Sequence, residues 1–240
     1  MTLLVTKPVT KPLTKPFHLI VFDWDGTLMD SETHIVSSME RAIADLNLPP
    51  LPRTSLSNVI GLGLTEAIAR LLPDEGAETR AGMVERYRHH YFTQDLSEPF
   101  AGAEEVLQEL TRQGYLLAVA TGKGRRGLDS VLASTGFGKY FHCTRCSEET
   151  RSKPHPQMLL EIMDVLDVAP GTTLMVGDTE YDLQMAREAG AAALAVDYGV
   201  HERDRLLQCN PLGCLDNIQR LPGWLARQSF TTSNITAELA

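Results

Sequence analysis

The sequence contains few cysteines and no long hydrophobic run. Its 240 residues include four cysteines, too few for the disulfide framework of a small secreted protein. No apolar run approaches the ~20 residues of a membrane-spanning helix. The first residues contain neither an apolar segment with a small-residue cleavage site nor the arginines of a transit peptide. We therefore expect a protein of the reducing cytoplasm.

The sequence also has fewer basic than acidic residues. The chain has 22 Lys and Arg residues against 31 Asp and Glu residues, which gives a net charge of −9. Such a chain repels the phosphates of nucleic acids and anionic membranes, so we expect neither as a partner. The hydrophobic share of 43% and the charged share of 22% are ordinary for a globular protein and exclude a mainly disordered chain. The oligomeric state stays open between monomer and homodimer.

The two ends of the chain differ from the rest. The tripeptide Thr-Lys-Pro occurs three times before residue 17. Proline at every fourth position interrupts both helices and strand ladders. We therefore predict flexible tails at residues 1–16 and 229–240.

Between the tails, short apolar runs alternate with amphipathic helical patterns. Continuous apolar runs suit strands of a parallel sheet that is covered on both faces. The predicted strands are residues 19–22, 115–120, 174–176 and 192–196, with a short one at 140–143. The alternation predicts an α/β, doubly wound, mainly parallel sheet, a Rossmann-like core made of residues 17–30 and 98–228.

Residues 31–97 break this alternation. They contain no convincing strand, but three helical patterns follow one another around Ile35, Ile68 and Met83. A proline-rich segment at 49–52 separates the first two patterns. This block predicts an inserted all-helical cap domain, tethered to the core near residues 30–31 and 98–99.

Three predicted strands end in polar residues. Asp23 and Asp25 follow the first strand, Thr121 and Gly122 the second, and Asp178 the third. Asp182 lies four residues further on, and Lys153 lies in a loop before a helix. Because ligands of open parallel sheets bind beyond the carboxyl ends of the strands, we expect these groups to converge on one site.

This set of residue types indicates metal-assisted phosphoryl transfer. Several carboxylates in one crevice stay ionised when a cation is present, and oxygen ligands favour Mg²⁺ over zinc. A carboxylate beside Mg²⁺ is a competent nucleophile toward phosphorus, and a second one can act as general acid and base. Lysine and threonine side chains can hold the phosphoryl oxygens.

The segment Asp23-Trp24-Asp25-Gly26-Thr27-Leu28 resembles the first motif of the haloacid dehalogenase-like hydrolase superfamily. Thr121, Lys153 and Gly177-Asp178 with Asp182 resemble its second, third and fourth motifs in the same order. The predicted helical insert resembles the cap of the phosphoglycolate phosphatase-like branch. The resemblance covers about residues 17–227.

The resemblance implies a Mg²⁺-dependent phosphatase that hydrolyses a small phosphate monoester through an aspartyl-phosphate. Asp23 would be the nucleophile and a metal ligand, and Asp178 a second ligand. Asp25 would be the acid/base, with its main-chain carbonyl toward the metal. Further implied roles are phosphate binding by Thr121, Gly122 and Lys153, support by Gly26, Thr27 and Asp182, and substrate specificity in the cap loop Gly61-Leu62-Gly63.

Other functions stay open. The presence of Asp25 favours a phosphate monoester. Thr27 stands where the related sugar-phosphate mutases often have valine, which disfavours a mutase but leaves it as an alternative. Gly122, Gly124 and Gly127 spell a G-x-G-x-x-G after a predicted strand, so a dinucleotide-dependent oxidoreductase is the alternative from another class. Neither the substrate nor a contact of Arg125 or Arg126 with it follows from the sequence.

Overall fold

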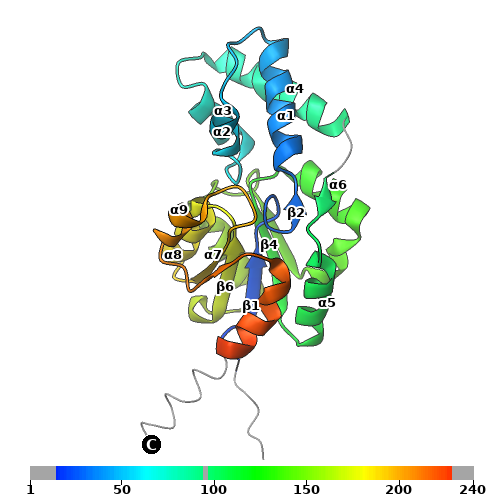
Figure 1. Cartoon of the computed structure of the whole chain (residues 1–240), viewed down its shortest axis with the longest axis vertical. Coiled ribbons are helices and arrows are strands. Elements are labelled where there is room, and N and C mark those ends of the chain that lie inside the picture. Colours follow the sequence, from blue (N-terminus) through cyan, green and yellow to red (C-terminus); the bar gives the residue numbers. More distant parts are fainter. Residues whose placement is uncertain (1–14, 94–96, 229–240) are drawn as a thin grey trace, which may run out of the picture.

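A computed structural model describes residues 15–93 and 97–228. The predicted tail at 229–240 and most of the one at 1–16 lie outside this described part. Figure 1 shows the molecule as an α/β part, which contains the sheet, and a helical part above it. Among the described residues, no helix is both long and apolar enough to cross a membrane.

A six-stranded parallel sheet forms the α/β part, in the order β5-β4-β1-β6-β7-β8. The central strand β1 pairs with β4 on one side and with β6 on the other. The doubly wound parallel fold expected from the sequence is therefore confirmed. The strands are β1 (Leu19–Phe22), β4 (Leu116–Thr121), β5 (Cys143–Cys146), β6 (Thr173–Gly177), β7 (Ala192–Val196) and β8 (Cys214–Leu215).

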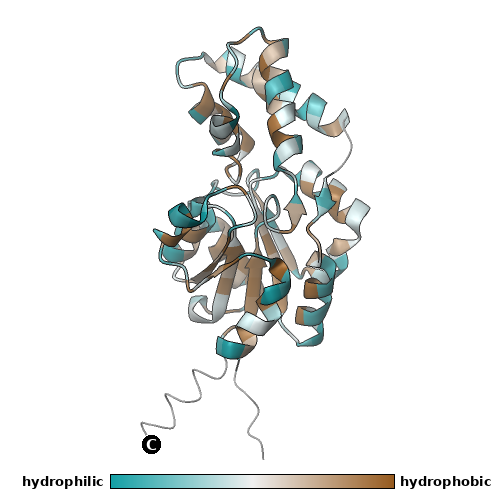
Figure 2. Ribbon diagram, viewed as in Figure 1, coloured by the Kyte–Doolittle hydropathy of each residue, from teal (hydrophilic) through white to brown (hydrophobic). Residues whose placement is uncertain are grey.

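Helices cover both faces of this sheet because successive strand residues point to opposite faces. Ile20 and Phe22 pack in one core cluster with residues of α5 and α6, whereas Leu19 and Val21 pack in another with residues of α7 and α8. Figure 2 shows the apolar strands enclosed between these layers. The helices of this part are α5 (Ala103–Arg112), α6 (Arg125–Thr135), α7 (Gln157–Leu166), α8 (Glu180–Glu188) and α9 (Arg203–Leu207).

One predicted strand was wrong. Residues 137–140 form a 3-10 turn, and β5 begins only at Cys143. Of the aromatic residues that made 140–143 resemble a strand, Tyr140 ends this turn and Phe141 follows it. Phe137 and Phe141 both pack edge-on against Trp24. The true strand β5 is an edge strand with two partly exposed residues, Thr144 and Arg145, so its apolar signal is weak.

The helical part consists of α1 (Glu32–Asp45), α2 (Arg53–Ser57), α3 (Leu64–Leu71) and α4 (Ala77–Thr93). Its buried residues form a core cluster of their own, which includes Val36, Met39 and Ile68. Two short antiparallel strands, β2 (Met29–Asp30) and β3 (Glu98–Pro99), pair where the chain enters and leaves this part. The sequence indicated neither this pairing nor α2, because each element is too short to show a period.

Candidate active site

The loop after β1 places Asp23 and Asp25 at the carboxyl end of the sheet. The Asp23 N–H donates to the Val176 carbonyl of the neighbouring strand, 2.9 Å away, which continues the ladder to the last residue before the loop. The carbonyl of Trp24 then accepts the N–H groups of Leu28 and Met29 at 3.0 Å. This tight turn keeps the carboxylate of Asp23 almost completely buried.

Lys153 lies between two carboxylates. Its Nζ is 2.7 Å from Asp23 Oδ1 and 2.6 Å from Asp182 Oδ1, and none of the three side chains is more than 1% exposed. The contacts are ion pairs without well-aligned hydrogen bonds. Burial alone would lower the pKa of Lys153, but Asp182 and Asp23 together hold it above its usual range. Lys153 therefore stays a cation beside Asp23.

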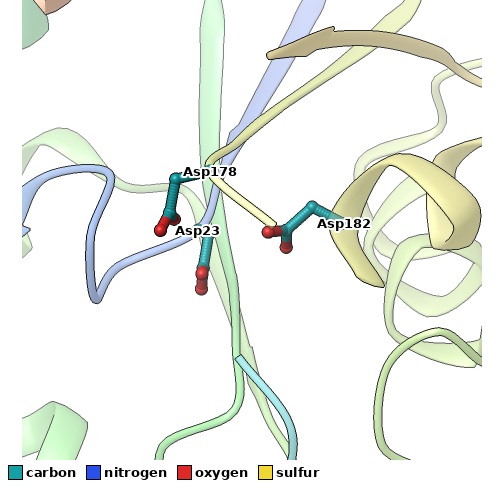
Figure 3. Close-up of side chains that lie close together, drawn as sticks. All are labelled: Asp23, Asp178 and Asp182. Atoms are coloured by element: carbon teal, nitrogen blue, oxygen red, sulfur yellow. The ribbon is translucent and has the colours of Figure 1, made fainter. Parts of the chain in front are cut away.

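Asp178 and Asp182 approach Asp23 from β6 and from the start of α8 (Figure 3). Thr27 Oγ1 donates to Asp178 Oδ1 at 2.8 Å, and the Val200 N–H donates to Asp178 Oδ2 at 2.9 Å. Asp182 Oδ2 accepts the N–H of Thr179 at 3.1 Å as part of a capping box. Asp182 thus stabilises the first turn of α8, whose N-cap residue is Thr179, and also pairs with Lys153.

Two glycines allow the backbone to approach Asp178. A Cβ at Gly26, whose φ is +83°, would lie 2.1 Å from Asp178 Oδ2. A Cβ at Gly199, in the loop after β7, would lie 2.4 Å from the same oxygen. A side chain at either position would displace this carboxylate. Gly26 was expected from the sequence, whereas Gly199 was not, because no motif points to it.

The buried carboxylates fit a divalent cation. One oxygen from each of Asp23, Asp178 and Asp182 can be chosen so that all three lie within 4.8 Å of one another. Asp23 Oδ2 is buried and has no hydrogen-bond partner among the described residues. Burial raises the pKa of Asp23 well above its ordinary value, and burial and the nearby Asp182 raise that of Asp178 to about 7. A cation among these oxygens would favour their ionised forms.

The carboxylate of Asp25 has partners outside this cluster. Its Oδ1 accepts the Ser31 hydroxyl at 2.6 Å and lies 2.9 Å from Lys123 Nζ. Lys123 also donates to the hydroxyl of Tyr91, on α4, at 2.6 Å. Sequence reasoning missed Ser31, Lys123 and Tyr91 as parts of the site. Of these three, only Lys123 could have been identified from the sequence, because it lies two residues after Thr121.

The predicted phosphate-binding and specificity residues meet at the same edge. Thr121, the last residue of β4, is fully buried, and its Oγ1 accepts the Lys123 N–H at 3.2 Å. A Cβ at Gly122 would lie 2.4 Å from the carbonyl oxygen of Leu62. The Gly63 N–H donates to the Ser152 hydroxyl at 2.8 Å. The loop of residues 61–63 in the helical part therefore lies directly against the loops of the sheet.

The two arginines at the start of α6 differ in their surroundings. Arg125 pairs with Glu149 at 2.7 Å and with Asp129 at 3.1 Å. Arg126, by contrast, lines the cleft between the helical part and the sheet, with its guanidinium 4.4 Å from the ring centre of Phe92. Arg126 therefore lies in the cleft, whereas Arg125 is held in ion pairs. The sequence alone did not distinguish the two as contacts of a substrate.

The G-x-G-x-x-G segment does not form a nucleotide cradle. It lies between β4 and α6, as that alternative requires, but a Cβ at Gly124 would lie 2.6 Å from Glu148 Oε1. Glu148 Oε2 accepts the Arg125 N–H at 2.9 Å, so a carboxylate caps the helix where a pyrophosphate would bind. The geometry therefore does not support the dinucleotide alternative.

His201 lies where the helical part meets the sheet, and it leads to a prediction on pH. Its Nδ1 accepts the Glu180 N–H at 3.1 Å, and burial, followed by Arg205, lowers its pKa. A lowered pKa in the folded state means that the stability contributed by neutral His201 is present above the unfolded value of about 6.5 and is lost as the pH falls below it. We expect the wild-type melting temperature to fall more steeply than that of His201→Gln between about pH 7 and about pH 5.5. Parallel curves would show that His201 does not contribute.

Comparisons with known proteins agree with this geometry. The haloacid dehalogenase-like hydrolase family matches residues 20–196. A protein of Dickeya dadantii named "Probable phosphatase IndB" is 37% identical over 212 residues, covering 85% of this chain and 92% of its own length. A phosphoglycolate phosphatase of Haemophilus influenzae is 31% identical over 218 residues, covering 85% and 96%.

Solved structures agree as well. The crystal structure of a "predicted phosphoglycolate phosphatase" from Haemophilus somnus matches with a TM-score of 0.80 at 25% identity, covering 87% of this chain and 97% of that one. The family match includes the segments that carry Asp23, Lys153 and Asp178. The chain therefore belongs to the haloacid dehalogenase-like hydrolase family and is an enzyme of the phosphoric monoester hydrolase type.

Proposed function

We propose that this enzyme is a Mg²⁺-dependent phosphatase that hydrolyses a small phosphate monoester through an aspartyl-phosphate on Asp23. The observation that carries the proposal is the state of the Asp23 carboxylate. One of its oxygens pairs with Lys153, while Oδ2 is buried without a partner in the described part of the chain. That oxygen lies at the carboxyl end of the sheet, where ligands of such folds bind.

The neighbouring residues supply the remaining chemistry. In the first step Asp23 attacks phosphorus, the bond from phosphorus to the leaving oxygen breaks, and Asp25 gives that oxygen a proton. In the second step water attacks the same phosphorus, Asp25 takes the proton, and phosphate leaves with Asp23 restored. Thr121, the Gly122 backbone and Lys153 hold the phosphoryl oxygens.

A metal ion would be held by Asp23 and Asp178, with the main-chain carbonyl of Asp25 as a further ligand. When bound, Mg²⁺ neutralises charge on the phosphoryl group. Thr27 and Val200 fix the orientation of Asp178 through the hydrogen bonds given above. Gly26 leaves room for that carboxylate, and Asp182 holds Lys153 in place.

Residues 31–97 act in this proposal as a cap on a core of residues 17–30 and 98–228. The cap loop of Gly61, Leu62 and Gly63 lines the cleft above Asp23, which fits a role in substrate selection. Closing such a cap excludes water until the substrate is bound. All four cysteines are free thiols, which fits the cytoplasmic location we propose.

The first test is the need for Mg²⁺. We expect release of inorganic phosphate from p-nitrophenyl phosphate with Mg²⁺ and loss of release in excess chelator. A sugar phosphate as substrate separates a phosphatase, which releases phosphate, from a mutase, which passes the phosphoryl group to a second sugar hydroxyl. Full turnover in excess chelator would contradict the proposal.

A second readout does not depend on turnover. Saturating Mg²⁺ at about 100 times its dissociation constant adds about 2.7 kcal/mol of stability, which corresponds to roughly 5–10 °C in melting temperature. Asp178→Asn should lose most of this shift. Asp129→Asn makes the same chemical change on the exposed face of α6 and should keep it. Equal shifts in both variants would remove Asp178 from the metal site.

A further inference from the structure

The cleft above the catalytic residues is large. Its volume is about 730 Å³, and both Asp23 and Asp25 line it. This volume lies within the range of roughly 300–1,000 Å³ for sites of drug-sized ligands. A two-carbon leaving group such as glycolate would leave most of the cleft to water. The size of the cleft therefore favours a bulkier leaving group.

The wall formed by the helical part is mainly apolar. Side chains from α1, α3 and α4 line it, among them Ile35, Met39, Ala69 and Tyr87. Thr65, Glu66 and Arg88 also line this wall, but all three are exposed. Hydroxyl groups of a sugar would meet few partners on its buried part, and each buried hydroxyl without a partner costs free energy. An apolar or aromatic ring loses nothing there and gains by burial. The wall therefore favours a ring-bearing leaving group over a plain sugar.

Tyr87 and Arg126 are polar side chains of the cleft that could bind such a ring. The hydroxyl of Tyr87 makes no hydrogen bond within the described part of the chain, although burial, with Tyr91 and Asp25, raises its pKa and keeps it a neutral donor. Arg126 lies over Phe92 and has no acidic partner among the described residues. Two donors beside an apolar wall suit a ring that carries acceptor atoms.

We propose that the natural substrate is the phosphate monoester of a primary alcohol that bears a heteroaromatic ring, with the ring in the cleft between α4 and α6. This inference rests on the proposed function, because that function places the phosphoryl group at Asp23. Tyr87 and Arg126 would donate to heteroatoms of the ring. The reaction stays the one given above and yields the free alcohol and phosphate.

A panel of esters that share a primary leaving oxygen tests the substrate class. The ring-bearing probes are pyridoxine 5′-phosphate and uridine 5′-monophosphate. Phosphoglycolate tests the small leaving group, and glucose 6-phosphate tests a bulky but hydrophilic one. We expect kcat/KM to be at least about tenfold higher for one of the ring-bearing esters than for the other two. A preference for phosphoglycolate or glucose 6-phosphate would overturn the inference.

Filling the cleft provides a structural test. Gly127 lines the cleft from α6, and a Cβ there meets no atom within 4 Å, so Gly127→Phe should enter the cleft without a clash. We expect the ratio of kcat/KM for the preferred ring-bearing ester to that for phosphoglycolate to fall about tenfold or more. Gly171 is equally open but is not among the cleft residues, so Gly171→Phe is the matched control and should leave the ratio unchanged.

Tyr87→Phe provides a second variant that keeps the ring and removes only the hydroxyl. Loss of one hydrogen bond should raise KM for the preferred ring-bearing ester about fivefold, with kcat little changed. Both variants can keep the wild-type ratio of kcat/KM for the ring-bearing ester to that for phosphoglycolate. That result in both Gly127→Phe and Tyr87→Phe would overturn the inference while leaving the proposed function in place. If p-nitrophenyl phosphate and all four esters are left intact with Mg²⁺ present, the proposed function fails and this inference fails with it.

Discussion

Asp23→Asn is expected to abolish turnover while the protein stays folded. Asparagine has nearly the same shape as aspartate, but its amide is a far poorer nucleophile, so kcat should fall by at least ~10⁴. The fold should survive because Lys153 keeps its second partner, Asp182, 2.6 Å away. Burial disfavours the charge of Asp23, so its removal relieves part of that cost in the metal-free protein.

The measurement combines turnover with structure. Phosphate release from p-nitrophenyl phosphate reports activity, and the far-ultraviolet circular dichroism and melting temperature report folding. Asp129→Asn, on an exposed part of α6, makes the same chemical change outside the site and should keep full activity. Wild-type rates in a well-folded Asp23→Asn protein would refute Asp23 as the nucleophile.

Asp25→Asn is expected to slow natural alkyl phosphates by about 10²–10⁴, the usual contribution of general acid–base catalysis. An alkoxide leaves poorly without a proton, which asparagine cannot supply. The first step with p-nitrophenyl phosphate should suffer less, because that leaving group scarcely needs protonation. Asparagine is preferable to alanine here because it keeps an acceptor for Ser31 and beside Lys123.

The second chemical step still needs a base, so phosphoenzyme should accumulate in the Asp25→Asn variant. Rapid quench with ³²P-labelled substrate would trap the label on Asp23. The conservative change Ser31→Ala, which removes one hydrogen bond to Asp25, should have a much smaller effect on both steps. Equal losses for alkyl and p-nitrophenyl esters in the first step, with no trapped label, would leave Asp25 only a positioning role.

Local patterns were enough to predict the core of the fold. The apolar run of β1 and the polar residues after it are contiguous in the sequence, and parallel strands bring their carboxyl ends to one edge. The convergence of Asp23, Lys153 and Asp178 could therefore be predicted from their order alone. The edge strand β5 could not be placed correctly, because within the described residues it pairs with β4 alone and its partly exposed residues hide the pattern.

The environment of Asp25 could not be predicted in the same way. Lys123 contacts both Asp25 and Tyr91 of α4, and the packing of a helix on a distant loop leaves no periodic signal. The same holds for Gly199, where glycine is needed because a Cβ would lie 2.4 Å from Asp178 Oδ2. Contacts between the helical part and the sheet depend on three-dimensional packing, which the sequence pattern does not specify.

The pairing of β2 with β3 has a consequence for how this enzyme could change in evolution. Met29 pairs with Pro99 and Asp30 with Glu98, so the two ends of the helical insert already touch where they leave the sheet. Closing a longer loop between fixed ends costs only about 0.6 kcal/mol for each doubling of its length. An insert of another size or shape could thus replace the present one at little cost to the sheet. New leaving groups could be acquired in this way while Asp23 and Asp178 keep their positions.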